Sequence, residues 1–224
     1  MLKRIKRFLV YFVAAALALS IALIGILRFL PAPTSAFMLH DHIDDLVSGN
    51  KYQPIDQQWA ERSQISRFAF AAVIAAEDQR FYRHNGFDFD SIYKAYRQHR
   101  NGGKLRGAST ISQQVAKNLF LSPARNLGRK VFEAWFTLLI ESLWSKNRIL
   151  EMYLNIAEFG DHLYGIEAAS RHYFGIPAKR LSAAQAALLA ATLPNPILLK
   201  ADRPSPYLLR RQKWILGQMR NLNF

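Results

Sequence analysis

Cysteine is absent from the 224-residue sequence, which excludes a disulfide framework, a catalytic thiolate and a thiolate zinc site. The six histidines show no paired spacing of the kind that metal ligands have. No internal repeat is present, and no segment alternates apolar and polar residues over the length of a strand. The lack of such strands predicts a domain that is almost entirely helical. Half of the residues are hydrophobic, which is enough to bury one core.

Acidic residues are scarce. Sixteen Asp and Glu stand against 30 Lys and Arg, so the formal net charge is +14. Such a charge favours an anionic partner, which could be nucleic acid, a membrane surface or a phosphorylated substrate. The charge by itself does not choose among the three.

Charge is missing altogether from Phe8 to Leu27, a run of 20 residues that is long enough for a helix to cross a bilayer core. Four of the seven residues before it are basic, and the first acidic residue is Asp41, which places the N-terminus in the cytoplasm. A cleaved signal peptide is the alternative, with Thr34 to Ala36 as the cleavage site. The apolar run, however, exceeds the roughly 7–15 residues of a signal core. We therefore predict an uncleaved, single-pass membrane anchor.

The chain divides into four predicted parts: a basic cytoplasmic tail (1–7), a transmembrane helix (8–28), a connector or small membrane-proximal lobe (29–64) and a helical domain (65–224). Apolar periodicity and capping residues predict helices within the domain, at 68–76, 89–99, 111–121, 131–144, from 146 onward, at 165–173 and at 183–193. A basic, glycine-rich loop at 100–107 is expected to be mobile and to become ordered on an anionic ligand.

Glu77 follows the apolar stretch 68–76, and partial burial at that place would raise its pKa toward the range of a general base. An ordinary structural interpretation competes with catalysis, because Arg80, Arg83 or a helix cap could satisfy the carboxylate. Asp78 is expected to orient its neighbours rather than to take part in the chemistry.

Hydroxyl groups and cations follow the loop. Ser109 and Thr110 have no His and Asp partner at a recognisable spacing, and helix capping explains these hydroxyls, so serine hydrolysis is rejected. Glu133 lies four residues after Arg129, which makes an ordinary helix salt bridge a competing interpretation. Four cations could form either a phosphate cradle or a solvated basic face: Lys117, Arg125, Arg129 and Lys130.

Taken in order, the polar clusters form five blocks: Glu77-Asp78-x-x-Phe81-x-x-His84-x-Gly86, Gly107-x-Ser109-Thr110-Ile111-x-Gln113-Gln114 with Lys117-Asn118, Arg129-Lys130-x-x-Glu133, Ile149-Leu150-Glu151-x-Tyr153-Leu154-Asn155, and Gly165-Ile166-Glu167-Ala168-Ala169 through Tyr173-Phe174-Gly175. These blocks resemble the signature blocks of the peptidoglycan glycosyltransferases, glycosyltransferase family 51. No Lys-Thr-Gly motif is present to complete the Ser-x-x-Lys and Lys-Thr-Gly context of a penicillin-binding transpeptidase domain, so the resemblance is to the monofunctional form.

The resemblance implies an all-α, lysozyme-like fold, in which a cleft separates a large lobe from a smaller membrane-proximal one. It also implies polymerisation of lipid II, by inverting transfer of the undecaprenyl-pyrophosphate-linked glycan to the 4-hydroxyl of an acceptor sugar. Glu77 corresponds to the general base of the family, and Glu133 to a second essential acid that organises the donor side.

The resemblance also implies roles for the remaining residues of the blocks. Lys117, Arg125 and Arg129 would neutralise the pyrophosphate leaving group, and Lys130 belongs to the same motif. Gln114, Ser109 and Thr110 would shape the sugar subsites and brace the second block. Phe132 stands where some relatives have lysine. A divalent ion near Glu133, Mg²⁺ or Mn²⁺, is implied as an optional cofactor.

The implied partners are lipid II, the glycan on undecaprenyl pyrophosphate, the lipid bilayer, and proteins of cell division or elongation. Nucleic acid is not among them, because the predicted topology places the basic domain outside the cytoplasm. The implied location is the bacterial cytoplasmic (inner) membrane, with the catalytic domain on its outer face.

Two alternatives stay open. A lytic transglycosylase or lysozyme would also use one glutamate in a helical cleft, but it needs no cations for pyrophosphate. A membrane-anchored scaffold of the cell-wall machinery could keep the fold without the activity, although loss of Glu77, Glu133 or Lys117 would then be expected.

Overall fold

The structure is a computed structural model of the chain, and it describes residues 2–49, 51–103, 109–124 and 126–222. Arg125, which the sequence assigned to the cation cluster, lies outside these residues. So does the part of the predicted mobile loop that follows Gly103.

Helices make up most of the described chain, which confirms the mainly helical fold class. They are α1 (Leu2–Leu27), α2 (Ala36–Val47), α3 (Arg67–Glu77), α4 (Phe89–Arg100), α5 (Ile111–Phe120), α6 (Leu127–Leu143), α7 (Lys146–Ile156), α8 (Ile166–Phe174), α9 (Ala183–Thr192) and α10 (Pro206–Asn221). Short 3₁₀ turns lie at Arg62–Gln64, Phe81–Arg83 and Ala178–Arg180.

A small sheet was not predicted from the sequence. Its strands are β1 (Asp56–Gln57), β2 (Glu158–Gly160) and β3 (Leu163–Tyr164), in the order β1-β3-β2. β1 runs parallel to β3, and β2 runs antiparallel to it. Strands of two or three residues are too short to show an alternating pattern, which is why periodicity missed them.

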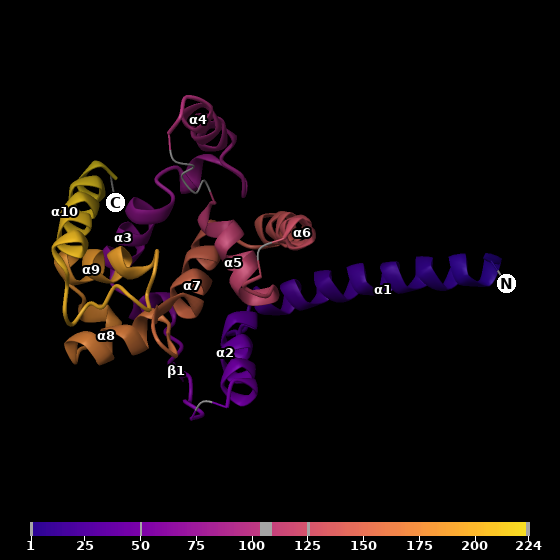
Figure 1. Ribbon diagram of the computed structural model, residues 1–224, viewed down its shortest axis with the longest axis horizontal. Coiled ribbons are helices and arrows are strands. Elements are labelled where there is room, and N and C mark those ends of the chain that lie inside the picture. The colour runs from indigo at the N-terminus through magenta and orange to yellow at the C-terminus, as the bar shows by residue number, and fades with distance from the viewer. Residues whose placement is uncertain (1, 50, 104–108, 125, 223–224) are drawn as a thin grey trace.

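The first helix, α1, extends away from the rest of the molecule to one end of its longest axis (Figure 1). Within it, Lys3–Leu27 is long and apolar enough to cross a membrane. Its C-terminal part is fastened to the folded domain, because Trp144 Nε1 donates to the carbonyl of Ile24 at 2.8 Å and Arg148 Nη2 donates to that of Leu27 at 2.9 Å. The guanidinium also lies at the carbonyl end of α1, where a positive charge is favourable.

The stretch predicted as a connector (29–64) is built into the folded domain. Helix α2 begins after the N-cap Ser35, and the hydroxyl of Tyr164 donates to Asp41 on this helix at 2.6 Å. Asn155 fixes the chain after β1 through two hydrogen bonds with the backbone of Ala60, at 2.7 and 2.9 Å. The residues before Ile65 therefore help to support the domain.

Helix α7 is buried from Ile149 to Ile156 and packs against α5, α6 and α8. Helices α5 and α6 pack on one side of the molecule, and α3, α9 and α10 form a group at the end away from α1 (Figure 1). Helix α10 was not predicted, because four basic residues interrupt its apolar pattern. Ser205 caps it, Pro206 occupies its first turn, and Leu208 and Ile215 are buried.

Candidate active site

Glu77 is the last residue of α3, a helix that is buried from Ala69 to Ala75. Ser66 caps the N-terminus of this helix by accepting a hydrogen bond from the Phe68 amide. At the other end the Glu77 side chain reaches a cavity and keeps 17% of its surface exposed. The carboxylate is therefore largely desolvated yet open to a ligand.

Two side chains hold the Glu77 carboxylate. Gln114 Nε2 donates to Oε2 at 3.1 Å, and Arg211 Nη2 lies 3.3 Å from Oε1. Gln114 is itself oriented by the buried Tyr153, whose hydroxyl donates to the Gln114 amide oxygen at 3.3 Å. Arg80, one of the alternative partners considered for Glu77, instead pairs with Asp88 and Asp90.

Burial raises the pKa of Glu77 above the ordinary carboxyl value. The hydrogen bond from Gln114 and the charges of Arg211 and Lys117 oppose this rise, while the charge of Asp78 adds to it. A carboxylate with a raised pKa is a better proton acceptor than an exposed one.

Glu133 lies on α6 and is only 2% exposed. Arg129 Nη1 donates to its Oε2 at 2.9 Å, one helical turn away, and the Lys130 ammonium contacts Oε1. The salt bridge expected from the spacing of Arg129 and Glu133 is therefore present. Glu133 holds the two cations at one place on the helix surface, where their free donors can meet an anion.

Lys117 on α5 lies in the electrostatic field of both acids. Burial lowers the pKa of its ammonium, Glu133 and Glu77 act to raise it, and Arg129 and Lys130 act to lower it. Its Nζ atom lies 5.0 Å from the ring centroid of Phe37 on α2. The ammonium is thus directed into the region between the two acidic residues.

Two cavities of about 330 and 340 Å³ open on these groups, and Ser109 lines both. The residues of the first are Ala75, Ala76, Glu77, Asp78, Gln79, Arg80, Asp88, Ser91, Lys94 and Ser109. The residues of the second are Phe37, Ser109, Gln113, Gln114, Lys117, Pro123, Arg129, Lys130 and Glu133. The first cavity contains the carboxylate with the raised pKa, and the second contains the cations.

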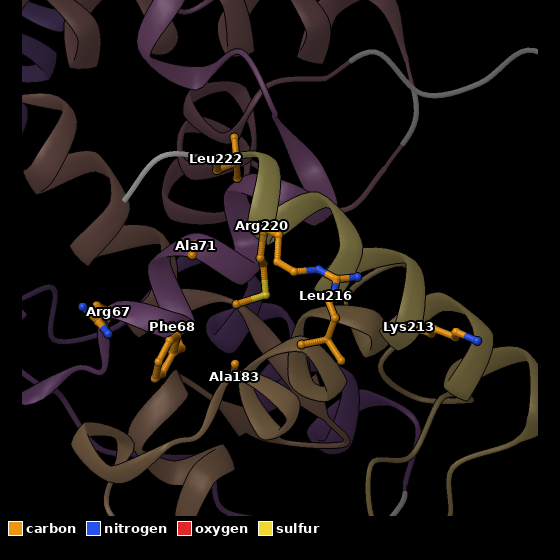
Figure 2. Close-up of a pocket in the computed structure, with 9 residues that line it drawn as sticks. Arg67, Phe68, Ala71, Ala183, Lys213, Leu216, Arg220 and Leu222 are labelled. Atoms are coloured by element: carbon orange, nitrogen blue, oxygen red, sulfur yellow. The ribbon is translucent and has the colours of Figure 1, made fainter.

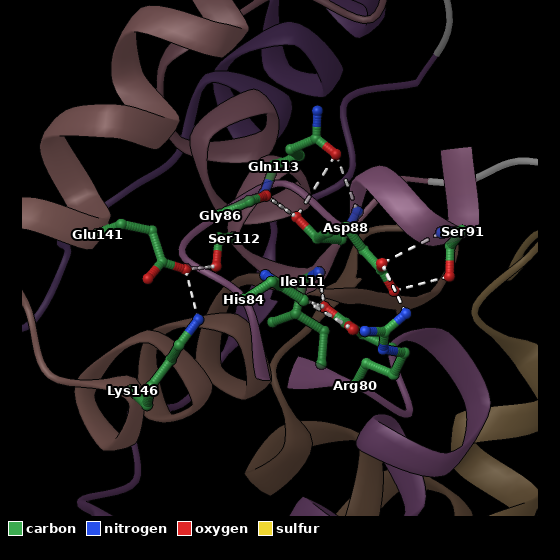
Figure 3. Close-up of polar contacts among 12 residues, drawn as sticks. Arg80, His84, Gly86, Asp88, Ser91, Ile111, Ser112, Gln113, Glu141 and Lys146 are labelled. Carbon is green, nitrogen blue, oxygen red and sulfur yellow. Dashed lines mark hydrogen bonds and ion pairs between the residues drawn. The ribbon is translucent and has the colours of Figure 1, made fainter. Parts of the chain in front are cut away.

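The segment between α3 and α4 is held against α5 by polar contacts (Figure 3). Asp78 Oδ2 accepts from the amide of Ile111 at 3.1 Å, and its Oδ1 lies 3.0 Å from His84 Nε2. The hydroxyl of Thr110 donates to the carbonyl of Gly86 at 2.6 Å. These contacts fix Asp78, the residue after Glu77, to the start of α5. Helix α5 also carries Gln114 and Lys117.

The structure brings most of the predicted site residues together, but not all of them line one of the two cavities. Thr110 and Gln113 form the expected capping box at the start of α5, and Thr110 lines neither of the two cavities. Ser109 is exposed between the cavities. We conclude that Thr110 supports the site, whereas Ser109 is accessible to a ligand.

The match to known proteins agrees with this geometry. The profile of a family described as Transglycosylase matches residues 45–220, which is most of the chain. The chain belongs to this family. The identification confirms the family predicted from the five blocks, with its lysozyme-like helical domain.

Similar proteins cover nearly the whole chain. Three examples bear the name biosynthetic peptidoglycan transglycosylase. That of Pasteurella multocida is 51% identical over 97% of this chain and 88% of its own length. That of Chromohalobacter salexigens is 51% identical over 99% of this chain and 94% of its own length. That of Pseudomonas aeruginosa is 48% identical over 97% of this chain and 91% of its own length.

Sequence reasoning missed one residue of this transglycosylase site and left another without a role. Arg211 contacts Glu77 from α10, 134 positions further along the chain, and no local pattern signals such a contact. Tyr153 belongs to the fourth block, but only the structure shows that it orients Gln114. Buried tyrosine hydroxyls usually have a partner, and that expectation was the one available signal.

The surroundings of Glu133 do not fit a divalent ion well. Arg129 and Lys130 engage its two oxygens, and the described residues contain no group of three His, Asp or Glu side chains able to hold a metal. The optional Mg²⁺ or Mn²⁺ stays a prediction, and no chemical step is derived through it.

Proposed function

We propose that this transglycosylase polymerises peptidoglycan glycan chains from lipid II at the outer face of the bacterial cytoplasmic membrane. The observation that carries the proposal is the pairing of two adjoining cavities, one with Glu77 and the other with Lys117, Arg129 and Lys130 around Glu133. A desolvated base beside a cation cluster suits attack by a hydroxyl and departure of a pyrophosphate.

In the proposed step the acceptor sugar lies on the side of Glu77. The 4-hydroxyl of the acceptor loses its proton to the Glu77 carboxylate as its oxygen attacks the anomeric carbon of the donor glycan. Gln114 and Arg211 hold the carboxylate so that one oxygen lone pair can face the cavity. A base that is fixed in this way needs little reorganisation in the transition state.

The donor occupies the side of the cations. As the new bond forms, the bond from the anomeric carbon to the pyrophosphate oxygen breaks, and undecaprenyl pyrophosphate leaves with the electron pair. Lys117, Arg129 and Lys130 stabilise the charge that develops on this oxygen. Glu133 keeps Arg129 and Lys130 in place, and it is not needed as a proton donor because pyrophosphate is a good leaving group. Attack opposite the leaving group inverts the anomeric configuration.

The membrane location follows from the substrate and the anchor. Lipid II carries a long apolar chain that remains in the bilayer, so an enzyme acting on its head group benefits from being held there. Helix α1 is attached directly to the domain: Trp135 contacts it from the middle of α6, and Trp144 and Arg148 contact it where α6 ends and α7 begins. The basic tail before α1 favours a cytoplasmic N-terminus and therefore an outward-facing domain.

Polymerisation of purified lipid II by the full chain in detergent tests the proposal. We expect long glycan from the wild type, and a loss of at least about a hundredfold in Glu77→Gln, the usual contribution of a general base or more. Glu61→Gln is the matched control, because Glu61 is exposed and lines neither cavity. Circular dichroism and a lipid II binding assay check that Glu77→Gln keeps its fold and its ligand.

Three results would contradict the proposal. Equal polymer from the wild type and Glu77→Gln would remove Glu77 as the base. Absence of polymer from well-folded wild type would favour a scaffold. Cleavage of preformed glycan without growth would favour the lytic, lysozyme-like alternative, which needs one acid in a cleft but no pyrophosphate site.

A further inference from the structure

A groove of about 500 Å³ lies between α3, α9 and α10, separate from both cavities of the active site (Figure 2). Its apolar residues are Phe68, Ala71, Ala183, Leu216, Met219 and Leu222. Three cations also line it, with Arg67 and Lys213 on opposite sides of Phe68 and Leu216 in the view of Figure 2, and Arg220 above them. The groove thus combines an apolar floor with a positively charged rim.

The rim cations are not neutralised by the protein itself. Arg67, Lys213 and Arg220 are exposed, and none of them forms an ion pair within the described ranges 2–49, 51–103, 109–124 and 126–222. The chain from 178 to 222 contains eight Lys and Arg but one acidic residue, Asp202. An occupant of the groove would therefore meet a positive potential on every side.

The position of the groove argues against a lipid occupant. Helices α9 and α10 lie at the opposite end of the long axis of the molecule from the N-terminal half of α1, the predicted anchor (Figure 1). A bilayer that surrounds α1 does not reach this end of the protein. The exposed apolar residues near the membrane, such as Phe29 and Leu30, lie at the junction with α1.

The same position argues against a second copy of the chain. Among the helices of the described residues, the one with a net acidic charge is α2, which carries exposed Leu39, Ile43 and Leu46 together with Asp44. Helix α2 adjoins the end of α1, whereas α10 lies far from it along the long axis (Figure 1). Two copies anchored in one bilayer would hold α2 and the groove at different heights.

We propose that the groove docks an extracytoplasmic segment of a partner protein, an amphipathic helix with apolar residues on one face and Asp or Glu beside them. The apolar residues would enter between Phe68 and Leu216, and the carboxylates would pair with Arg67, Lys213 and Arg220. Apolar anchors in a pocket with charges at its rim are the usual anatomy of such a contact.

The groove is prepared for docking, because its walls are fixed without an occupant. Gln212 Nε2 donates to the carbonyl of Ala184 at 2.8 Å, which ties α10 to α9. Leu208 and Ile215 are fully buried and hold α10 against the core. The occupant therefore meets a surface that does not have to fold on binding, and this lowers the entropic penalty of association.

Fluorescence anisotropy with a designed peptide tests the proposal. The probe is a labelled helix with Leu and Glu at i, i+3 and i+4 spacing, added to the full chain in nanodiscs of zwitterionic lipid. Two further probes carry Lys in place of Glu or Gln in place of Leu. We expect only the acidic amphipathic probe to bind. Its affinity for the double variant Lys213→Glu and Arg220→Glu should be about tenfold weaker, because two of the three rim charges are reversed.

Two more variants separate the groove from general charge. Leu216→Ala shortens the apolar floor and leaves the charge unchanged, and it should also weaken binding. Lys200→Glu combined with Arg203→Glu makes the same change in net charge outside the groove and should leave the affinity unchanged. Circular dichroism shows whether each variant is folded.

The proposal is overturned if the acidic probe does not bind to the wild type. It is also overturned if the two double variants weaken binding of this probe equally. It is also overturned if the Lys213→Glu and Arg220→Glu variant instead loses binding to anionic vesicles, which would assign the groove to a lipid surface. Loss of a wild-type oligomer in the same variant, seen by size-exclusion chromatography, would assign the groove to a second copy.

Discussion

The guanidinium of Arg211 lies 3.3 Å from carboxylate oxygen Oε1 of Glu77, although the two residues are 134 positions apart in the chain. The contact joins α10 to the end of α3 at the active site. Burial raises the pKa of Glu77, and Gln114, Arg211 and Lys117 limit that rise. The basicity of the proposed base therefore depends on a helix outside the five sequence blocks.

Replacing Arg211 with Ala should raise the pKa of Glu77 further, because a charge that stabilises the carboxylate is removed. The base is active when it is ionised, so the acidic limb of the profile of kcat/KM against pH should move to higher pH. The pH profile of lipid II polymerisation measures this shift. Arg210→Ala is the control, since Arg210 is an exposed neighbour and has no contact with Glu77. An unshifted acidic limb in Arg211→Ala would show that Arg211 does not tune the base.

Several features of the site could be predicted because they depend on local spacing. Thr110 and Gln113 are three residues apart, and both hydrogen bonds of their capping box are present. Arg129 and Glu133 are one helical turn apart, and their salt bridge is present. Glu77 follows an apolar stretch that forms a buried helix, as its composition indicates.

Other features were missed because they depend on contacts between distant segments. Arg211 approaches Glu77 only after α10 packs on α3 and α9. Helix α10 was itself missed because basic residues interrupt its apolar pattern. The short sheet pairs β1 with β3, more than 100 residues later, and neither strand is long enough to show a period.

Lys117→Ala should slow glycan transfer by about 10²–10³-fold, as loss of one donor to a developing oxyanion does. Lys117→Arg keeps the positive charge at this place and should recover part of the rate. The expected loss is in the rate at saturating lipid II, rather than in acceptor binding. Lys179→Ala, which changes an exposed lysine outside both cavities, should keep the wild-type rate. A normal rate in Lys117→Ala would remove this residue from the donor side.

Gly86→Ala should destabilise the protein by about 1–3 kcal/mol, because Gly86 has φ +87° and a side chain there is strained. An added Cβ would also lie 2.8 Å from Thr137 Cγ2 and 3.0 Å from Glu141 Cγ. Glu141 cannot move away easily, since Ser112 and Lys146 both bind its carboxylate (Figure 3). The free energy of unfolding in detergent, measured with a chemical denaturant, gives the loss.

Gly217→Ala is the control for that measurement. Gly217 lies inside α10 with nothing within 4 Å of an added Cβ, so alanine should stabilise the helix by about 0.5–1 kcal/mol. Equal effects of the two substitutions would contradict the assignment of backbone strain to Gly86.

Glu158 provides a stability test that is independent of catalysis. Burial raises its pKa to about 7, the nearby Asp41 and Asp161 add to the rise, and His162 and Lys200 oppose it. In the unfolded chain the same carboxyl ionises near 4.5. Between these two values the unfolded chain releases the proton more readily, so the contribution of Glu158 lowers the stability of the folded protein as the pH rises from about 4.5 to 7.

Glu158→Gln removes this ionisation while keeping the size of the side chain. The variant should match the wild type near pH 4.5 and should be more stable by about 2–3 kcal/mol at pH 8, the order expected for a shift of this size in a group with some solvent contact. Denaturant unfolding at both pH values measures the difference, and Glu61→Gln, at an exposed site, should show none. A wild-type advantage at pH 8 would mean that Glu158 is ionised and stabilised in the folded state, with His162 and Lys200 outweighing its burial.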